Sequence, residues 1–434
     1  MKARLSICWF RRDLRLDDHA AFFHALKSPY PVLPVFIFDP DILDELTDKY
    51  DPRISFIYNT LRALDLRLQD HGSGFYVVYS SIEEAFLKIL DTFDVQAVFT
   101  NNDYEPYAIK RDANIRALLG SRGILFQSYK DQVIFEKLEI LKSDGSPYTI
   151  FTPYSRQWKQ KFTTAELTGY PSEKFLSNLF KTKQFQFPEL EETGFSSLDP
   201  VMPKPDFSER TIRNYHKTRD FPSPGGTSHV SHYLRFGIIS IRRVVSLAYK
   251  WNETWLNELI WREFFMMILY CFPGVVSESF KKKYDKIPWR NDEKEFELWC
   301  KGETGYPLVD AGMRQLNETG WMHNRVRMIV AGFLTKHLLI DWRWGEAYFR
   351  QKLLDYELSS NNGNWQWAAG SGCDSAPYFR IFNPITQAKK FDPRQAYVRT
   401  WIKDFDSYDI PPVVENDFAR KRAISVYRQA LSEV

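Results

Sequence analysis

Short apolar runs and longer amphipathic segments alternate along the first 130 residues of the chain. Five runs have the length of a strand, and their sequences are "LSICWF", "PVLPVFIFD", "FYVVY", "VQAVFT" and "ILFQSY". Segments with helical spacing separate them, most clearly "RISFIYNTLRALDLRLQDHG" and "YAIKRDANIRALLGSRG". Alternation of this kind is typical of βαβ units, in which helices cover both faces of a parallel sheet. The pattern predicts a Rossmann-like α/β domain over residues 1–130.

The pattern changes twice beyond this domain. Residues 131–205 are rich in Pro, Ser, Gly and acidic side chains, as a long connector would be. From residue 206 to 434, apolar residues recur with helical spacing and strand signals are few. The predicted fold class is therefore α/β plus all-α, with an α/β domain (1–130), a connector (131–205) and a helical domain (206–434).

Composition narrows the class of protein. A hydrophobic fraction of 44% and a charged fraction of 26% over 434 residues are those of a globular protein. The longest apolar run, "FFMMILYCF", is too short to cross a bilayer, and the N-terminus lacks an apolar signal-peptide core. The four cysteines have no C-x-x-C spacing and the eight histidines no metal-binding spacing. We expect a cytoplasmic protein without metal, disulfide or membrane contact.

Net charge does not indicate a class of partner, whereas tryptophan content sets the late part of the chain apart. A net charge of +3 does not by itself indicate a nucleic-acid partner. The first predicted strand is not followed by a Gly-x-Gly-x-x-Gly motif, so dinucleotide binding in the α/β domain has no support. Tryptophan is concentrated late in the chain, where 11 of the 13 lie beyond residue 250.

Two late segments place polar and aromatic side chains together. In "GWMHNRVRM", Trp321, Asn324, Arg325 and Met328 follow the i, i+3, i+4, i+7 spacing of one helix face. Such a face lines a binding site, or else its Arg and Asn close a seam between two helices.

"WLNELIWREFF" places Trp255, Glu258, Trp261 and Arg262 on successive turns. The alternative to a buried carboxylate site is an exposed Glu–Arg pair.

In "GTSHVS", Thr227, Ser228 and Ser231 could cradle an anion at a helix start, or simply cap the helix. Finally, "NNGNWQW" sets an amide cluster beside two tryptophans, which fits neither an ordinary core nor a solvent loop.

These segments resemble motifs of the photolyase/cryptochrome family, and in particular of its bacterial class I cyclobutane pyrimidine dimer photolyases. The matching stretches, in order, are "WFRRDLRLDDH", "GTSHVS", "ELIWREF", "TGYPLVDAGMRQLNETGWMHNRVRM", "LLIDWRWGEAYF" and "NNGNWQWAAGSGCDSAPYFRIFNP". They span nearly the whole chain. The resemblance implies an α/β domain followed by a helical domain that binds FAD.

The resemblance also assigns residues to the cofactor. Asn361 matches the amide that faces the reactive N5 edge of the flavin, and Asp355 the acidic partner of Arg327. Many relatives have Asp where this chain has Glu357, which has one more methylene. The implied cofactor-binding residues are Tyr215, Thr227, Ser228, His229, Val230, Ser231, Trp255, Glu258, Arg262, Trp321, Asn324, Arg327, Asp355, Tyr356, Glu357 and Asn361.

The reaction implied by the resemblance is light-driven repair of DNA. Excited, reduced FAD passes an electron to a pyrimidine dimer that has left the duplex, the ring splits, and the electron returns. Glu258 and Asn361 are the implied catalytic residues, and Trp365, Trp342 and Trp289 an electron-transfer chain toward the surface. The implied DNA-binding residues are Arg219, Trp261, Arg262, Asn324, Arg325, Met328, Trp367 and Gln387.

Related activities stay open at this point. A 6-4 photoproduct photolyase typically has histidines where this chain has Asn324 and Met328, and a DASH-type cryptochrome usually has Tyr where Trp367 stands. Cryptochrome photoreceptors often carry long C-terminal tails, whereas this chain stops soon after its last helical segment. The residues therefore favour a repair enzyme, expected to act as a monomer on ultraviolet-damaged DNA.

The second, light-harvesting dye of the family is not decided by the sequence. Folate-binding relatives have an Asn-Glu pair where this chain has Tyr107 and Ala108, and a Cys-Lys pair where it has Val275 and Val276. Folate is therefore not favoured, and a deazaflavin, a flavin or an empty site stays open.

Overall fold

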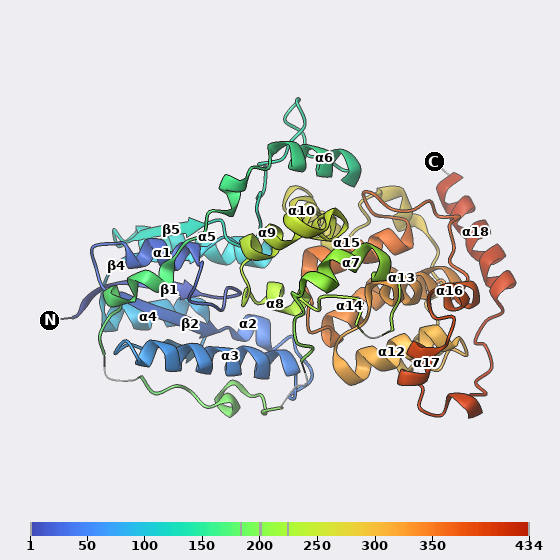
Figure 1. Cartoon of the computed structure of the whole chain (residues 1–434), viewed down its shortest axis with the longest axis horizontal. Helices are drawn as coiled ribbons and strands as arrows, with labels where there is room; N and C mark the ends of the chain where they lie inside the picture. The colour runs from blue at the N-terminus through green and yellow to red at the C-terminus, as the bar shows by residue number, and fades with distance from the viewer. Residues whose placement is uncertain (1, 183–184, 199–201, 224, 433–434) are drawn as a thin grey trace. The chain divides into compact units, whose positions relative to one another are not determined.

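The computed structural model describes residues 2–182, 185–198, 202–223 and 225–432 (Figure 1). Contacts between Cα atoms divide the chain into two compact units. The first comprises Met1–Glu136, Lys161–Val201 and Val230–Leu247, and the second comprises Lys137–Gln160, Met202–His229 and Ala248–Val434. Each unit is therefore built from three separate stretches of sequence.

A parallel five-stranded sheet forms the centre of the first unit. Its strands are β1 (Arg4–Phe10), β2 (Val32–Phe38), β3 (Tyr76–Tyr79), β4 (Asp94–Asn101) and β5 (Leu125–Tyr129). Their order in the sheet is β3-β2-β1-β4-β5, and every neighbouring pair is parallel. The central strands β1 and β2 are almost wholly buried, which is why they appear in the sequence as continuous apolar runs.

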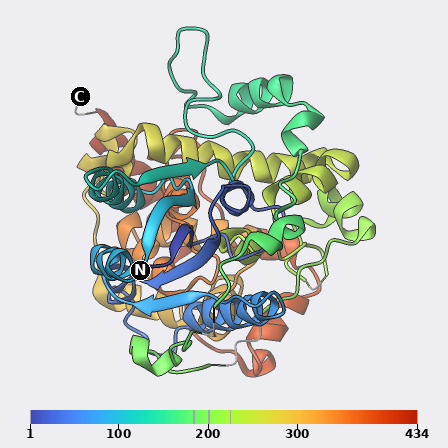
Figure 2. The same cartoon turned by 90° about the vertical axis from the view of Figure 1, so that its left-hand side faces the viewer.

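Helices cover both faces of this sheet (Figure 2). One face packs on α1 and α3 through side chains such as Phe22 and Leu61, and the other on α4 and α5 through Phe86 and Ile115. The helices within the stretches of this unit are α1 (Ala20–Leu26), α2 (Pro40–Leu43), α3 (Pro52–Gln69), α4 (Ile82–Thr92), α5 (Pro106–Gly120), η1 (Thr164–Leu167), η2 (Ser172–Asn178), η3 (Leu190–Thr193) and α8 (Ser231–Arg235).

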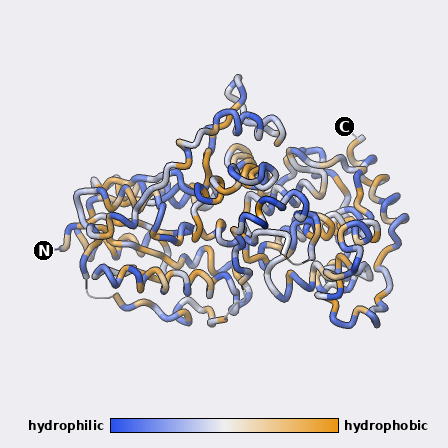
Figure 3. The backbone as a smooth tube through the Cα atoms, in the orientation of Figure 1, coloured by the Kyte–Doolittle hydropathy of each residue, from blue (hydrophilic) through white to orange (hydrophobic). Residues whose placement is uncertain are grey.

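The second unit is helical in its described residues apart from turns and an isolated bridge between Leu141 and Pro147. Its largest core gathers buried side chains from several helices, among them Trp299, Met313, Val330 and Trp365. Figure 3 shows apolar and polar residues alternating along these helices, as expected where one face is buried.

The helices of the second unit begin with α6 (Phe151–Lys161) and α7 (Glu209–Thr218), and α9 (Ile241–Trp251) spans the last boundary between the units. The remaining elements are α10 (Glu253–Cys271), η4 (Pro273–Val276), η5 (Lys282–Lys286), α11 (Glu293–Lys301), α12 (Pro307–Thr319), α13 (Asn324–Gly332), η6 (Phe333–His337), α14 (Trp342–Lys352), α15 (Leu358–Ala369), α16 (Pro384–Phe391), α17 (Ala396–Trp401), η7 (Phe405–Ser407) and α18 (Asn416–Ser432).

The predicted fold class is confirmed: a parallel α/β sheet occupies the N-terminal part and helices the remainder. The contacts divide the predicted connector, 131–205, between the two units, and residues 183–184 and 199–201 of it lie outside the described part. Within the described residues, no helix is long and apolar enough to span a membrane, and no cluster of three or more His, Cys, Asp or Glu could hold a metal ion.

Candidate functional site

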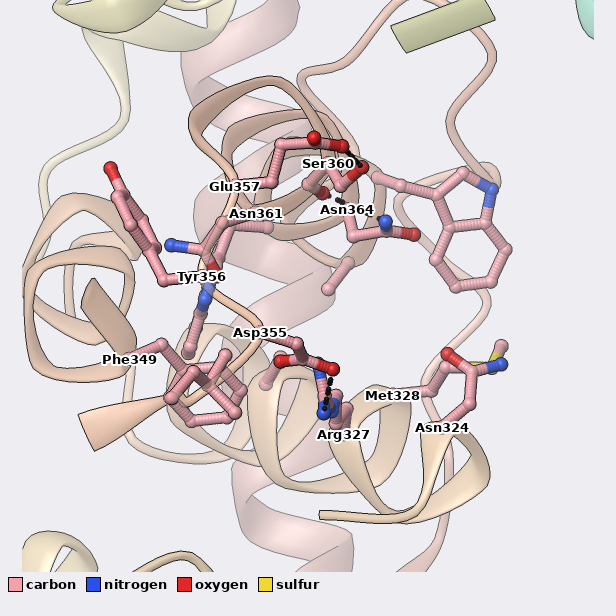
Figure 4. A pocket seen from close by; sticks show the side chains of 15 residues that line it. Asn324, Arg327, Met328, Phe349, Asp355, Tyr356, Glu357, Ser360, Asn361 and Asn364 are labelled. Carbon is pink, nitrogen blue, oxygen red and sulfur yellow. Dashed lines mark hydrogen bonds and ion pairs between the residues drawn. The ribbon is translucent and has the colours of Figure 1, made fainter. Parts of the chain in front are cut away.

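A hollow with a cavity volume of about 100 Å³ opens between α13, α14, α15 and the segment before α15. Its lining mixes apolar side chains with amides and one ion pair (Figure 4). The predicted residues that line it are Asn324, Arg327, Met328, Asp355, Tyr356, Glu357, Asn361, Trp365 and Trp367. Residues about 30 positions apart in the sequence thus meet around one space.

Six further lining residues were not singled out by the sequence. They are Ala331, Phe349, Leu353, Ser360, Asn364 and Ala368. Most lie on the same helices as predicted residues, three or four positions away, so helical spacing from Asn361 and Arg327 could have found them.

An ion pair closes one side of the hollow. Arg327 binds Asp355 through both of its terminal nitrogens, at 3.1 and 2.9 Å, and its Nε donates to the backbone oxygen of Met322 at 2.8 Å. Asp355 has only 5% of its side chain exposed. This two-pronged geometry fixes the plane of the guanidinium group and leaves a rigid charged edge on the hollow.

Glu357 holds the other side together. Its carboxylate accepts from Arg262 on α10 at 3.1 Å and from the Ser360 hydroxyl at 3.1 Å. Its backbone oxygen accepts from the backbone N–H of Asn361. The longer Glu side chain, found where many relatives have Asp, therefore reaches across to α10 and joins it to the start of α15. Figure 4 shows Glu357 and Ser360 facing each other above the hollow.

Asn361 is oriented by a carboxylate that the sequence reading missed. Its amide nitrogen donates to the backbone oxygen of Glu346 at 3.1 Å and to the side-chain Oε1 of Glu346 at 2.9 Å. Burial raises the pKa of Glu346, and the hydrogen bond from Asn361 partly opposes that rise. These two bonds engage the side-chain nitrogen of Asn361, a residue that lines the hollow. The sequence feature that could have identified Glu346 is "DWRWGEAYF", where this acidic residue follows a glycine in a helix rich in aromatic residues.

Trp365 fits against a glycine on the neighbouring helix. A Cβ atom added to Gly345 would lie 2.1 Å from the ring of Trp365, so only glycine allows this approach. The ring also contacts Phe349 at 5.0 Å and Trp299 at 6.1 Å, measured between centroids. Trp299 is fully buried and was not among the predicted residues.

The other two tryptophans of the predicted chain lie in the same unit. Trp342 begins α14, one turn before Gly345, and is buried; among the described residues its Nε1 has no hydrogen-bond partner. Trp289 is partly exposed and contacts Tyr427 at 5.9 Å. The close approach of Trp365 to α14 therefore brings it near the helix that carries Trp342.

Glu258 pairs with a residue far away in the sequence. Arg219, at the end of α7, donates to its carboxylate. Burial raises the pKa of Glu258, and the charge of Arg219 partly opposes that rise. Glu258 therefore does not form the exposed pair with Arg262 that the sequence left open, because each of the two has a different partner.

The predicted helix face over "GWMHNRVRM" needs a correction. Helix α13 begins at Asn324, where the His323 side chain accepts from the amide of Arg325, and α12 ends before Gly320 in the left-handed conformation. Trp321 therefore lies in the turn between two helices and shares no helix face with Met328. Its ring instead lies 4.6 Å from that of His229.

The segment "GTSHVS" does not use Ser or Thr as a helix cap. Val230 stands at the N-cap position of α8 and makes no side-chain cap. His229 has a φ of 49°, an uncommon backbone conformation for a non-glycine residue, and burial lowers its pKa. The simple capping alternative is therefore wrong here.

The residues predicted to meet DNA are distributed over several elements. Trp367 and Met328 line both the main hollow and a smaller neighbouring one, with a cavity volume of about 10 Å³. Arg325 pairs with Asp220 at 2.5 Å, and Gln387 lies on α16.

Of all the predicted residues, those outside the lining of the main hollow are Tyr215, Arg219, Thr227, Ser228, His229, Val230, Ser231, Trp255, Glu258, Trp261, Arg262, Trp289, Trp321, Arg325, Trp342 and Gln387.

Comparison with known families covers both parts of the chain. Residues 6–172 match the family model described as "DNA photolyase", and residues 255–429 match "FAD binding domain of DNA photolyase". The chain belongs to the DNA photolyase family. Every residue that lines the main hollow lies within the part matched by the FAD-binding model of this family.

Relatives within the family are similar over their full length. The deoxyribodipyrimidine photo-lyase of Vibrio cholerae is 36% identical over 432 residues, covering 93% of this chain and 91% of that protein. A bacterial class III photolyase structure from Agrobacterium tumefaciens has a TM-score of 0.88 at 31% identity, and covers 99% of this chain and 98% of its own. The archaeal photolyase from Sulfolobus tokodaii, solved with two FAD molecules, has a TM-score of 0.78 at 32% identity and covers 98% and 99%.

Proposed function

We propose that this chain repairs cyclobutane pyrimidine dimers in DNA under blue or near-ultraviolet light, with FAD as its cofactor. The main support is that its curated relatives are deoxyribodipyrimidine photo-lyases and that the hollow lies wholly within the segment matched by the FAD-binding family model.

The lining of the hollow fits a flavin by its chemistry. Ligand pockets commonly have apolar walls and a few fixed polar groups. Phe349, Leu353 and Trp365 offer flat or apolar surfaces, while Asn361 and the Arg327–Asp355 pair offer fixed polar groups. A planar ring with polar edges requires this combination. When bound and reduced, FAD supplies the light-excited electron that splits the dimer and afterwards takes it back.

The chain's own residues orient this chemistry. Asn361, held by Glu346, would present its amide to the reactive edge of the flavin. Trp365, Trp342 and Trp289 would conduct an electron from the surface to restore the reduced form. Tyr215, Trp255, Trp321 and the segment from Thr227 to Ser231 would hold the remainder of the cofactor.

Glu258 and Arg219 would meet the polar edge of the dimer together. They are already paired, with the Arg219 guanidinium donating to the Glu258 carboxylate. Negative charge develops on the dimer when it accepts an electron, and donors fixed at that place stabilise it.

The dimer must leave the duplex to reach the hollow. Extrusion of the target is the established solution of photolyases and of other enzymes that act on a base. Trp261 and Trp367 would stack on it, at about 1–3 kcal/mol per base. Arg262, Asn324, Arg325, Met328 and Gln387 would complete the contacts with DNA. A monomer in the cytoplasm is the expected form.

Light harvesting by a second dye is a separate part of the proposal. Tyr107, which stands where folate-binding relatives have an Asn, donates to Asp39 through its hydroxyl. We therefore expect a flavin or deazaflavin dye, or none. The absorption spectrum of the purified protein after FAD release would reveal which.

Illumination of the purified, reduced protein with damaged oligonucleotides tests the function. One oligonucleotide carries a cyclobutane dimer and the other a 6-4 photoproduct, and restored bases are scored in light and in darkness. Repair of the cyclobutane dimer alone, in light alone, is the expected result. Repair of the 6-4 lesion alone would assign that lesion instead. A flavin-loaded protein that repairs neither would be a photoreceptor.

A further inference from the structure

Trp261 is not a lone ring on its helix. The ring of Phe151 lies parallel to it, at 3.7 Å between centroids and 5° between planes. Phe264 meets both rings edge-on, at 5.6 Å from Trp261 and 5.9 Å from Phe151. Phe265 also contacts the indole, at 5.4 Å between centroids and 31° between planes. One face is therefore covered by a flat partner, and base stacking on Trp261 is confined to the part of the ring that neither Phe151 nor Phe265 covers.

The partner ring comes from a helix anchored firmly to α10. Phe151 is the first residue of α6, and Trp158 two turns later is fully buried, with its Nε1 donating to Glu263 at 2.5 Å. Lys159 pairs with Glu253 at 2.6 Å near the other end. Contacts at both ends of α6 thus fix its position along α10, and with it the position of the Phe151 ring.

A third segment fixes the backbone of Phe151. Its amide donates to the carboxylate of Asp374 at 3.1 Å. Asp374 belongs to the segment 370–383, whose residues Ala376, Pro377 and Arg380 line the smaller hollow together with Trp367. The start of α6 is therefore attached both to the helix of Trp261 and to the segment beside Trp367.

We propose that Phe151 is a positioning residue that holds Trp261 as a preformed, one-sided stacking wall for the extruded pyrimidine dimer. This rests on the proposed function. A tryptophan on a helix surface can otherwise turn about two side-chain bonds, and ordering it on binding reduces affinity. With Phe151 stacked on it, the indole plane is set before DNA arrives.

The choice of substitution follows from the geometry. Phe151→Leu keeps apolar volume at the start of α6 but removes the flat face, whereas Phe151→Tyr keeps the flat face. Asp374→Ala removes the acceptor for the backbone N–H of Phe151 but does not alter the Phe151 side chain. Phe418→Leu on α18 is a matched control, because Phe418 is 58% exposed and distant in sequence from these elements.

The measurement is the dissociation constant for a dimer-containing oligonucleotide and for the same sequence without damage, with FAD content determined for each protein. Phe151→Leu should lose about five- to tenfold in affinity for the dimer and keep its affinity for undamaged DNA. Asp374→Ala should shift in the same direction by a smaller factor. Phe151→Tyr and Phe418→Leu should behave as wild type.

A double-mutant cycle with Trp261→Ala separates positioning from general damage to the fold. In the Trp261→Ala background, Phe151→Leu should have no further effect on the ratio of the two affinities. Equal losses in both backgrounds, or an unchanged ratio in Phe151→Leu, would overturn the inference. If wild type itself fails to prefer dimer-containing DNA, the proposed function fails instead, so the two outcomes are distinguishable.

Discussion

Trp365 is proposed to relay an electron to the flavin, and at the scale of single residues this role can be tested by substitution. Trp365→Phe should slow light-driven reduction of oxidised flavin at least tenfold, because phenylalanine is a far poorer electron donor. The variant reduced chemically beforehand should still repair dimers. Absorbance of the flavin under illumination, in the presence of a thiol reductant, measures the first effect. Loss of repair in the prereduced variant would refute the relay role.

Trp299→Phe is the matched control for that variant. Trp299 contacts Trp365 from the side of the buried core, and its Nε1 donates to the backbone oxygen of Val330. A relay through Trp342 and Trp289 predicts that Trp299→Phe leaves the reduction rate within about twofold of wild type.

Glu346 acts on Asn361 through its side-chain oxygen. Glu346→Gln keeps an acceptor for the Asn361 amide, whereas Glu346→Ala leaves only the backbone oxygen. We expect Glu346→Ala to speed the dark re-oxidation of reduced flavin by air about threefold or more, while Glu346→Gln stays near wild type. Absorbance at flavin wavelengths after anaerobic reduction follows this rate. Identical behaviour of the two variants would exclude a positioning role.

Glu258 is the residue for which repair and binding should separate. Glu258→Ala should retain FAD and keep its affinity for dimer-containing DNA within about threefold, yet repair fewer dimers per absorbed photon. Its half-buried, Arg219-paired carboxylate would act only when charge develops on the dimer. Glu297→Ala, on the exposed face of α11, is the control. A wild-type quantum yield in Glu258→Ala would remove its proposed role.

At the scale of helices, close contact of α14 with α15 depends on glycine. A Cβ atom on Gly345 would lie 2.1 Å from the Trp365 ring, so Gly345→Ala must push two helices apart. We expect a loss of about 1–3 kcal/mol from overpacking, larger than the gain of about 1 kcal/mol that alanine brings to a helix. Thermal unfolding of the FAD-loaded protein measures it.

Gly120→Ala provides the comparison for that loss. Gly120 ends α5, and a Cβ atom there would meet nothing within 4 Å. This variant should be neutral or slightly more stable. Equal destabilisation by both substitutions would show that contact with Trp365 is not the cause.

The sequence predicted elements best where one physical pattern dominates. Buried strands such as β1 and β2 show as unbroken apolar runs, and α3 and α5 as long periodic segments, so their positions could be predicted to within a few residues. The turn before α13 could not, because its boundary depends on the capping bond from the Arg325 amide to His323.

Site residues divide in the same way. Arg327 and Asp355 could be named as partners because the family resemblance assigns both to the cofactor. Glu346 and Phe151 act through partners at distant positions in the chain, Asn361 and Trp261, and no local pattern records such a contact. Phe151 also lies in the segment 131–205, whose composition predicts a connector. The polar residues of the neighbouring turn outnumber the few residues of α6 that pack on α10, so composition does not reveal this packing.

At the scale of the whole molecule, buried histidines make stability depend on pH. Burial lowers the pKa of both His323 and His337 to about 4. Such a histidine is neutral in the folded state, while in the unfolded state it takes up a proton below pH about 6.5. Stability is therefore fully present above pH about 6.5 and is lost as the pH falls toward about 4.

Melting temperatures at several pH values test this dependence. The melting temperature of wild type should fall between pH 7.5 and pH 4.5, with FAD loading held constant. His337→Gln keeps a polar partner for Asn416 but cannot take up a proton, so its decline should be smaller. An equally steep decline in that variant would assign the effect to other groups.

The close packing around Trp365 also bears on the rate of the electron transfer proposed for it. The ring is 2% exposed, and Gly345, Phe349 and Trp299 contact it. Neighbours packed at this density and shielded from water have few dipoles that can reorient when the ring gains or loses charge. For the proposed relay, this packing would keep the reorganisation energy of the step through Trp365 small, so the same glycine that lets two helices meet would also lower the barrier to that step.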